Sequence, residues 1–190
     1  MVAPLLNYIS AKDYLKVERA ATEKHELHEG QIVTMSGASL PHNYIVRNLF
    51  GQIFSFLKEK KCTVFTSDLR VHILTTDSFT YPDLSIVCGK PEMLDNTFDT
   101  LTNPSVLIEV MSRSTEKYDR GTKFFYYMQI ASLKEYILVD SNSVFVQVAT
   151  RQADNSWKFE EWRDVAASFE IKTIEKSVAL SEVYEDVEFG

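Results

Sequence analysis

An acidic residue stands in the middle of one of the most apolar segments of the sequence. Glu109 interrupts Val106-Leu107-Ile108-Glu109-Val110-Met111, a run of strand length that is hydrophobic on both sides of the acid, as in a strand covered on both faces. A buried carboxylate without a partner is costly, so we expect Glu109 to meet a metal ion, a cation or hydrogen-bond donors. Taken alone, a structural salt bridge with a helix residue explains Glu109 equally well.

A second acid, Asp83, stands at the beginning of another predicted strand. It follows Pro82, which lacks an N–H and suits the first position of a strand, so Asp83 is expected near the end of the sheet, where a side chain can reach a cleft. An aspartate in a turn is the common alternative. Two carboxylates on neighbouring strands would offer oxygen ligands to a hard divalent cation such as Mg²⁺.

A polar turn and a predicted helix follow the strand that carries Glu109. Within this segment Asp119 and Lys123 are four residues apart and share a helix face. A surface ion pair is the ordinary explanation for such a pair. Because the helix directly follows the Glu109 strand, the same face can instead point back at the two carboxylates.

The elements that must position these residues follow from the hydrophobic periodicity. Helices are predicted at residues 10–20, 39–60 and 115–130, and a last helical turn from residue 180. Strands are predicted at residues 31–35, 62–66, 69–74, 84–87, 106–111, 136–139, 144–148 and 157–162. Strands on both sides of the helix at 115–130 indicate a mixed sheet flanked by helices, of the α/β or α+β class.

Length and charge set the limits within which these elements work. The chain has 190 residues, 45% of them hydrophobic and 25% charged, which predicts one domain over residues 1–190 with a substantial core. The net charge of −7 at first counts against a nucleic-acid partner. However, residues 1–130 carry 14 basic and 15 acidic side chains, and residues 131–190 carry 6 and 12. The segment with every candidate residue is therefore nearly neutral, which predicts weak, metal-dependent and salt-sensitive DNA binding with the acidic C-terminal segment facing away.

The cysteines and the N-terminal residues bear on the compartment. Cys62 and Cys88 lie far apart in apolar surroundings and form no C-x-x-C pair, which predicts buried reduced thiols in a cytosolic protein and no disulfide framework. The first ten residues have neither a basic leader nor a long apolar core. We therefore expect a cytoplasmic protein without membrane insertion.

The histidines of His25-Glu26-Leu27-His28-Glu29 are three residues apart, whereas the zinc motif H-E-x-x-H needs four, so this stretch is expected to be a solvated segment. The aromatic residues at 124–127 could stack on bases, but their helical spacing favours packing in the core. The glycine patterns of serine hydrolases, nucleotide hydrolases and dinucleotide-binding proteins do not occur in the sequence.

Several motifs occur in an order and spacing that resemble one known family. They are Pro82-Asp83, then Ile108-Glu109-Val110 with Ser112 and Ser114-Thr115, then Tyr118-Asp119-Arg120-Gly121 with Lys123, and Lys134-Glu135-Tyr136-Ile137-Leu138-Val139-Asp140, preceded by His25-Glu26-Leu27-His28-Glu29-Gly30-Gln31-Ile32 and His42. Residues 10–187 thus resemble a restriction-endonuclease family that is abundant in cyanobacteria and belongs to the PD-(D/E)XK nuclease superfamily. The resemblance implies a restriction-endonuclease-like fold with a mixed central β-sheet flanked by helices.

The resemblance also implies roles for the matching residues. Asp83 and Glu109 would be the metal-binding acids, with Mg²⁺ or Mn²⁺ as the cofactor. The usual lysine position of the superfamily, two residues after the acid that Glu109 matches, is Met111 here. Lys123 on the following helix is the natural substitute, and Lys117 is the weaker candidate.

The N-terminal motif and the residues around the helix would support this core. Glu26 would be an accessory acid, although the family's aspartate and glutamate on either side of the glycine are Glu29 and Gln31 in this chain. His42, Ser112 and Asp119 would bind substrate or support the acids.

These expectations combine into one function and two alternatives. We expect a divalent-metal-dependent endonuclease that hydrolyses DNA phosphodiester bonds, with catalysis by Asp83, Glu109, Lys123 and Glu26. A homodimer would suit the cleavage of both strands. The first alternative is a nuclease-fold accessory protein that binds nucleic acid without efficient cleavage. The second is a protein-interaction module in which Glu109 and Lys123 form a structural bridge.

Overall fold

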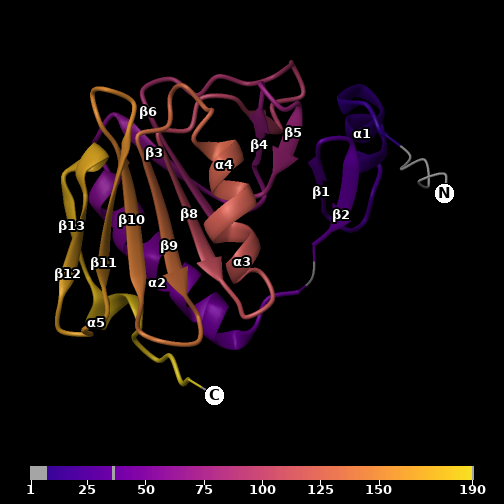
Figure 1. Ribbon diagram of the computed structural model, residues 1–190. Coiled ribbons are helices and arrows are strands. Elements are labelled where there is room, and N and C mark those ends of the chain that lie inside the picture. Colours follow the sequence, from indigo (N-terminus) through magenta and orange to yellow (C-terminus); the bar gives the residue numbers. More distant parts are fainter. Residues whose placement is uncertain (1–7, 36, 190) are drawn as a thin grey trace.

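A six-stranded mixed sheet forms the centre of the computed structural model, which describes residues 8–35 and 37–189 (Figure 1). The strand order is β11-β10-β9-β8-β6-β3, and only β8 and β9 run parallel among these neighbours. The strands are β3 (Cys62–Thr66), β6 (Leu84–Cys88), β8 (Val106–Met111), β9 (Glu135–Asp140), β10 (Val146–Arg151) and β11 (Trp157–Trp162). All six residues of β8 are buried, as its nearly continuous apolar run predicts.

One face of this sheet is covered by the long helix α2 (Leu40–Leu57). Ser39 caps it by accepting a hydrogen bond from the backbone N–H of His42, and a proline lies in its first turn. Its buried residues are the four that recur at every fourth position, Ile45, Leu49, Ile53 and Leu57. They pack against the inward side chains of the central strands, which confirms the helix and the face predicted for it.

The opposite face is covered by a helical segment that connects the parallel strands β8 and β9 (Figure 1). The sequence predicts one α-helix here, but the segment has three parts: α3 (Glu116–Tyr118), a π-helical turn η1 (Asp119–Lys123) and α4 (Phe124–Tyr127). A π-helical turn holds an extra residue and changes the direction in which side chains point, and such turns occur often at functional sites. The buried residues of η1 are Asp119 and Lys123, two of the candidate site residues.

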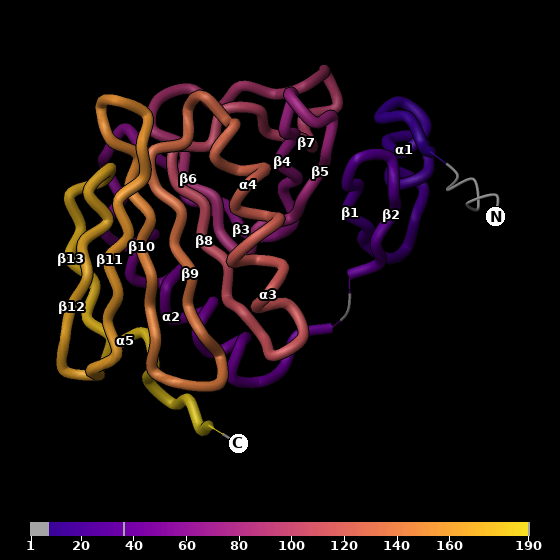
Figure 2. Tube along the Cα trace, in the orientation of Figure 1, coloured from indigo at the N-terminus to yellow at the C-terminus, as the bar shows by residue number. Residues whose placement is uncertain are grey.

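A smaller five-stranded sheet has the strand order β2-β1-β5-β4-β7, and it joins the N-terminal hairpin to strands from the middle of the chain. Its strands are β1 (His25–His28), β2 (Gln31–Thr34), β4 (Arg70–Ile73), β5 (Ser78–Thr80) and β7 (Thr100–Leu101). Helix α1 (Ala11–Glu18), capped by Ser10 as predicted, packs Tyr14 against Leu27 and Phe79 of this sheet. Figure 2 shows the trace of α1, β1 and β2 beside β5.

Strands β1 and β2 form a hairpin through a two-residue turn. Glu29 and Gly30 have φ angles of 48° and 83°, and two positive φ angles in succession match a turn that suits the twist of paired strands. The sequence predicts β2 but misses β1. The expectation of a solvated segment at residues 25–29 is wrong, because His25–His28 pairs with β2 and its two central residues are buried.

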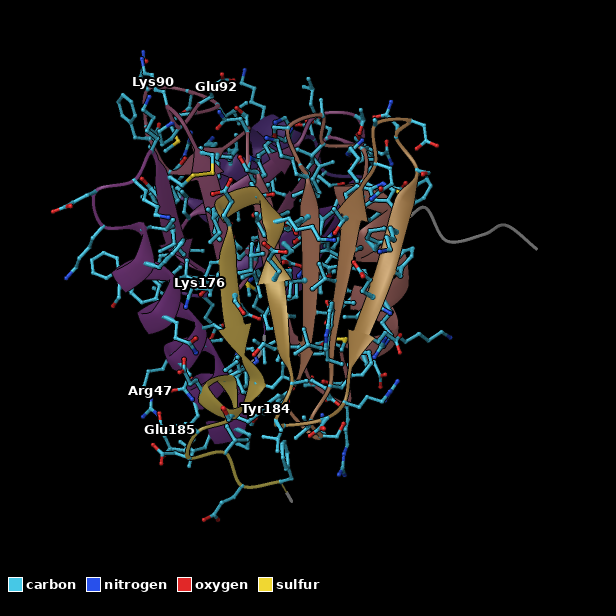
Figure 3. The ribbon with its side chains drawn as sticks, turned by 90° about the vertical axis from the view of Figure 1, so that its left-hand side faces the viewer. Arg47, Lys90, Glu92, Lys176, Tyr184 and Glu185 are labelled. Atoms are coloured by element: carbon cyan, nitrogen blue, oxygen red, sulfur yellow. A yellow bond between two sulfur atoms is a disulfide. The ribbon has the colours of Figure 1, made fainter. Side chains whose placement is uncertain are left out.

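The C-terminal elements lie at the other end of the molecule in Figure 1. They are β12 (Ser168–Ile171), η2 (Lys172–Ile174), β13 (Lys176–Ala179) and α5 (Leu180–Val183). Helix α5 packs on α2, where Asn48 donates to the carbonyl groups of Val183 and Glu185, and Figure 3 shows Arg47, Tyr184 and Glu185 at this contact. In residues 8–35 and 37–189 no helix is long and apolar enough to cross a lipid bilayer.

The two cysteines form a disulfide, so the expectation of reduced thiols is wrong. Cys62 on β3 is the direct register partner of Cys88 on β6, and their Cα atoms are 4.0 Å apart. The sequence conceals this pair because 26 positions separate the cysteines and only the antiparallel register of the two strands brings them together. The reduced-thiol argument for a cytosolic protein therefore falls.

We expect the protein purified without reductant to expose no free thiol when it is unfolded in guanidinium, because the chain has only these two cysteines. In the chain-entropy model a cross-link across a segment of this length contributes about 3.5 kcal/mol. The double variant Cys62→Ala/Cys88→Ala should therefore lose about that much free energy of unfolding in urea titrations. Excess dithiothreitol should abolish the difference between the two proteins, and two titratable thiols in the untreated wild type would contradict the bridge.

Candidate functional site

Glu109 points from the centre of β8 toward the helical segment α3-η1-α4. Leu107 and Met111, two residues to either side of it, belong to the apolar cluster on that face, and the alternation of a strand puts Glu109 on the same face. Its Oε1 atom accepts hydrogen bonds from Tyr127 Oη at 2.7 Å and from Lys123 Nζ at 2.9 Å. Glu109 is only 5% exposed, and this burial raises its pKa well above the usual range of a glutamate.

Asp83 lies beside Glu109, immediately before the neighbouring strand β6. Leu84 of β6 pairs with Ile108 of β8 in antiparallel register, so the preceding residue on one strand and the following residue on the other are adjacent. Asp83 Oδ2 accepts the backbone N–H of Val110 at 2.7 Å. The two acids singled out from the sequence are therefore brought to one end of the β6–β8 pair.

His42, in the first turn of α2, holds Asp83 from the other side. Its Nε2 atom lies 3.1 Å from Asp83 Oδ1, and its Nδ1 atom lies 3.0 Å from the carbonyl oxygen of Val110. Burial opposes a charge on the ring, but the hydrogen bond to Asp83 and its negative charge raise the pKa of His42. A protonated ring donates to both acceptors and so fixes the carboxylate of Asp83 against β8.

Lys123 is the counter-charge of the site. Its Nζ atom lies 2.9 Å from Glu109, 3.2 Å from Glu26 and 3.9 Å from Asp119. Burial alone would lower the pKa of this lysine, but the surrounding carboxylates outweigh burial and raise the pKa well above its usual value. Lys123 therefore stays charged in the neutral pH range.

Glu26 reaches Lys123 from the N-terminal hairpin. Its Oε1 atom also accepts the backbone N–H of Tyr81 at 2.9 Å, and its Oε2 atom lies 3.0 Å from His28 Nε2. Burial would raise the pKa of Glu26, but the charge of Lys123 and the hydrogen bond to His28 lower it to about 2. The accessory acid proposed from the N-terminal motif thus lies in the cluster and is ionised.

Negative charge exceeds positive charge in this cluster. Three carboxylates, those of Glu109, Glu26 and Asp119, lie within 4 Å of the single ammonium group of Lys123. Burial together with mutual repulsion raises the pKa values of both Glu109 and Asp119. A divalent cation would offset this excess. Within the described chain no three His, Cys, Asp or Glu side chains converge as a ready-made metal cage, but Mg²⁺ commonly takes only one or two carboxylates and keeps water as its other ligands. The pair Asp83 and Glu109 therefore fits such an ion.

Other candidates lie outside the cluster. Lys117 is exposed on α3. Ser112 ends the strand segment, and its hydroxyl bonds to Ser114 and Thr115 at the start of the helical segment. His25, which the zinc motif would require, lies 3.0 Å from Glu18 instead.

Sequence reasoning missed the tyrosines that complete the site. Tyr127 bonds to Glu109, and Tyr118 bonds through its hydroxyl to the ring of His28 at the hairpin. Tyr127 is four residues after Lys123, a spacing at which side chains share a helix face, so the signal was present in the sequence. The helical spacing of the aromatic residues at 124–127 predicts that they pack in the core. This spacing does not show that one of their phenols faces an acid.

We expect Lys123→Met to lower the free energy of unfolding by about 3–5 kcal/mol at pH 8, because it leaves buried carboxylates without their cation. Without Lys123, the folded-state pKa of Glu109, already above its unfolded value, rises further, and that of Glu26 loses the charge that keeps it low and rises as well. Such acids destabilise the fold as pH increases through the unfolded value, so the loss should shrink toward pH 5. Urea titrations at both pH values measure it. Lys117→Met is the control and should change stability by less than about 0.5 kcal/mol; a loss for Lys123→Met that is equal at both pH values would contradict the charge argument.

The chain is similar to known proteins over nearly all of its length. Residues 11–180 match the model of the Uma2 family, described as "Putative restriction endonuclease". Two uncharacterized proteins of Synechocystis sp. are each 34% identical to the chain. For sll1609 the match covers 85% of this chain and 91% of that protein, and for slr1290 it covers 95% and 94%.

A solved structure agrees with the fold. The crystal structure described as "a putative nuclease belonging to DUF820" from Anabaena variabilis matches with a TM-score of 0.78 at 17% sequence identity, over 95% of this chain and 99% of that one. The fold is thus restriction-endonuclease-like, as the motifs predict. With 170 consecutive residues matched by the family model and two relatives at 34% identity, the chain belongs to the Uma2 family of restriction-endonuclease-like proteins.

Proposed function

We propose that this protein is a divalent-metal-dependent endonuclease that hydrolyses DNA phosphodiester bonds. The observation that carries the proposal is the meeting of Lys123 with Glu109, at 2.9 Å, beside Asp83, which immediately precedes the adjacent strand. Two acids that can hold a divalent cation and a lysine beside them are groups that metal-assisted phosphodiester hydrolysis can use. Membership of the Uma2 family supports the same reaction.

In this proposal Asp83 and Glu109 hold Mg²⁺ or Mn²⁺. The bound ion would supply Lewis-acid stabilisation of the phosphate and lower the pKa of water. The position two residues after Glu109 is occupied by Met111, which is buried in the apolar cluster beneath α4. The cationic role therefore falls to Lys123, which reaches the same acids from the π-helical turn.

Lys123 would orient the attacking water and offset the charge that develops on the phosphate. The high pKa of Lys123 keeps it cationic, so it would act through its charge and its N–H donors and not as a base. Glu26 would hold Lys123 in place from the hairpin side, and His42 would hold Asp83. Preorganised groups of this kind need no rearrangement when the charge develops.

The charge and the exposure of the site bear on how DNA would approach. Among the charged side chains of the cluster Asp83 and His42 are the most exposed, at 17% and 16%, so the phosphate would enter on their side. The elements β12, β13 and α5 lie at the end of the molecule opposite the N-terminal hairpin in Figure 1, whereas β9, which also belongs to the acidic residues 131–190, lies directly beside β8. We propose a cytoplasmic location, where such an enzyme would meet DNA.

Two observations favour the two alternative functions. The buried Lys123–Glu109 pair is also what a structural bridge in a protein-interaction module would have, and Met111 in the usual lysine position suits an accessory nucleic-acid-binding protein. Titration calorimetry with Mn²⁺ separates these readings. The bridge predicts no metal binding, whereas the accessory protein predicts binding of metal or DNA without turnover.

We expect supercoiled plasmid to be nicked or linearised in Mg²⁺ or Mn²⁺ and to stay intact in excess EDTA. The variants Asp83→Asn, Glu109→Gln and Lys123→Met should each lower the initial rate by at least about 100-fold, because each removes charge that acts on the transition state. Asp186→Asn serves as the control, since Asp186 pairs with Arg47 near the exposed C-terminal tail. Undiminished cleavage by Asp83→Asn or Glu109→Gln protein would refute the assignment.

We also propose that the active form is a homodimer, since two sites related by a two-fold axis would cut both strands of a duplex. Light scattering should then give twice the mass of one chain. Plasmid should be linearised without accumulation of nicked circles, since both strands are cut in one encounter. A monomer that produces only nicked circles would overturn the dimer and leave the nuclease proposal intact.

A further inference from the structure

The phenol of Tyr127 is a buried polar group inside the site for which the proposed reaction has no role. The side chain is 0% exposed, on α4. Its hydroxyl lies 2.7 Å from Glu109 Oε1 and 3.1 Å from Thr80 Oγ1, and Thr80 on β5 is also fully buried. A phenol has one proton, and the shorter contact to the carboxylate takes it, so the hydroxyl of Thr80 donates to the phenol oxygen. A chain of hydrogen bonds thus runs from β5 to Glu109.

Two donors meet on the same oxygen of Glu109. Lys123 Nζ, at 2.9 Å, joins the phenol at Oε1. A carboxylate oxygen with two donors has its lone pairs occupied, which leaves Oε2 as the oxygen with which Glu109 can bind a cation. The two donors come from consecutive turns of one helical segment, so they fix the rotation of the carboxylate as well as its place.

We propose that Tyr127 is a positioning residue that holds Glu109 Oε1 and thereby presents Oε2 to the divalent cation. The inference rests on the proposed function, because it assumes that Glu109 binds the metal. Without the phenol of Tyr127, the carboxylate of Glu109 would be held by Lys123 alone and could rotate. Hydrogen-bonding partners behind a metal ligand typically change metal affinity by 10–100-fold when they are removed.

Packing alone does not explain a tyrosine at this position. A phenylalanine ring would fill the same space, and phenylalanine occurs at positions 124 and 125 of the same run. Burying a hydroxyl is unfavourable unless it is hydrogen-bonded, and here both partners of the phenol are themselves polar and buried. The hydrogen bonds of the hydroxyl to Glu109 and Thr80 therefore explain why this position holds tyrosine and not phenylalanine.

The test is Mn²⁺ titration calorimetry on the full chain, with Tyr127→Phe compared with wild type. We expect the Kd for Mn²⁺ to increase by 10–100-fold. Tyr184→Phe is the matched control, because Tyr184 is also a buried tyrosine whose hydroxyl bonds to the backbone of Phe145 and Asp140, at the α5 end labelled in Figure 3. Its Kd should stay within twofold of wild type, although both variants lose a buried hydrogen bond.

A second variant covers the case in which Tyr127→Phe does not fold. Thr80→Val keeps the phenol and the size of the side chain but removes the hydroxyl that orients the phenol, and it should weaken Mn²⁺ binding in the same direction by a smaller factor. Wild-type Kd values for both Tyr127→Phe and Thr80→Val would overturn the positioning role and leave the nuclease proposal standing. Equal weakening in Tyr127→Phe and Tyr184→Phe would also overturn it, since the cause would then be general destabilisation. A wild-type chain that binds no Mn²⁺ would refute the metal role of Glu109 and the inference with it.

Discussion

The ammonium group of Lys123 is the interaction on which the arrangement of the site depends. It is buried, and it neutralises carboxylates from β1, β8 and the π-helical turn, of which β1 is far from the other two in the sequence. A buried ammonium or carboxylate without its partner would cost several kcal/mol, so each of these segments is held where it can share the charge. The negative charge that remains is what would attract the cation in the proposed reaction. The same buried charges thus hold these segments together and would take part in the proposed reaction.

The helical segment after β8 delivers this charge because of its π-helical turn. The turn buries Asp119 and Lys123 while α4 continues with the aromatic residues that pack on β9 and β11. Because a π-turn has an extra residue, one helical segment can present an apolar side to the sheet and a polar side to the site. The apolar side of the segment is satisfied by Phe124 and its aromatic neighbours, and the polar side is satisfied by Glu109 and Glu26. Met111, which fills the usual lysine position, is free to be part of the core.

The N-terminal hairpin closes the site on the side opposite β8. Glu26 is fixed by the backbone of Tyr81 and by Lys123, and His28 is held between the rings of Tyr118 and Tyr126. The hydroxyl of Tyr81 in turn donates to the buried Glu18 of α1. Polar contacts of Tyr81 with Glu26 and Glu18 thereby link the first helix and the hairpin to the cluster around Lys123. This explains how a small hairpin with a limited apolar core of its own is kept in place.

Local patterns in the sequence predict the long helix α2, the buried strand β8 and the candidate residues Asp83, Glu109 and Lys123. Each of these depends on residue type and spacing within one segment: a four-residue apolar repeat, an acid in an apolar strand, a proline before an acid, a lysine on the next helix. The sequence does not predict the short strands β1, β5, β7, β12 and β13, because two to four residues carry too little periodicity and these segments lack the adjacent apolar β-branched residues found in β2. Only the tertiary structure pairs Cys62 with Cys88 and Tyr127 with Glu109. Those contacts depend on strand register and on the rotation of a π-turn, and both are decided by packing between segments and not by the order of residues within one.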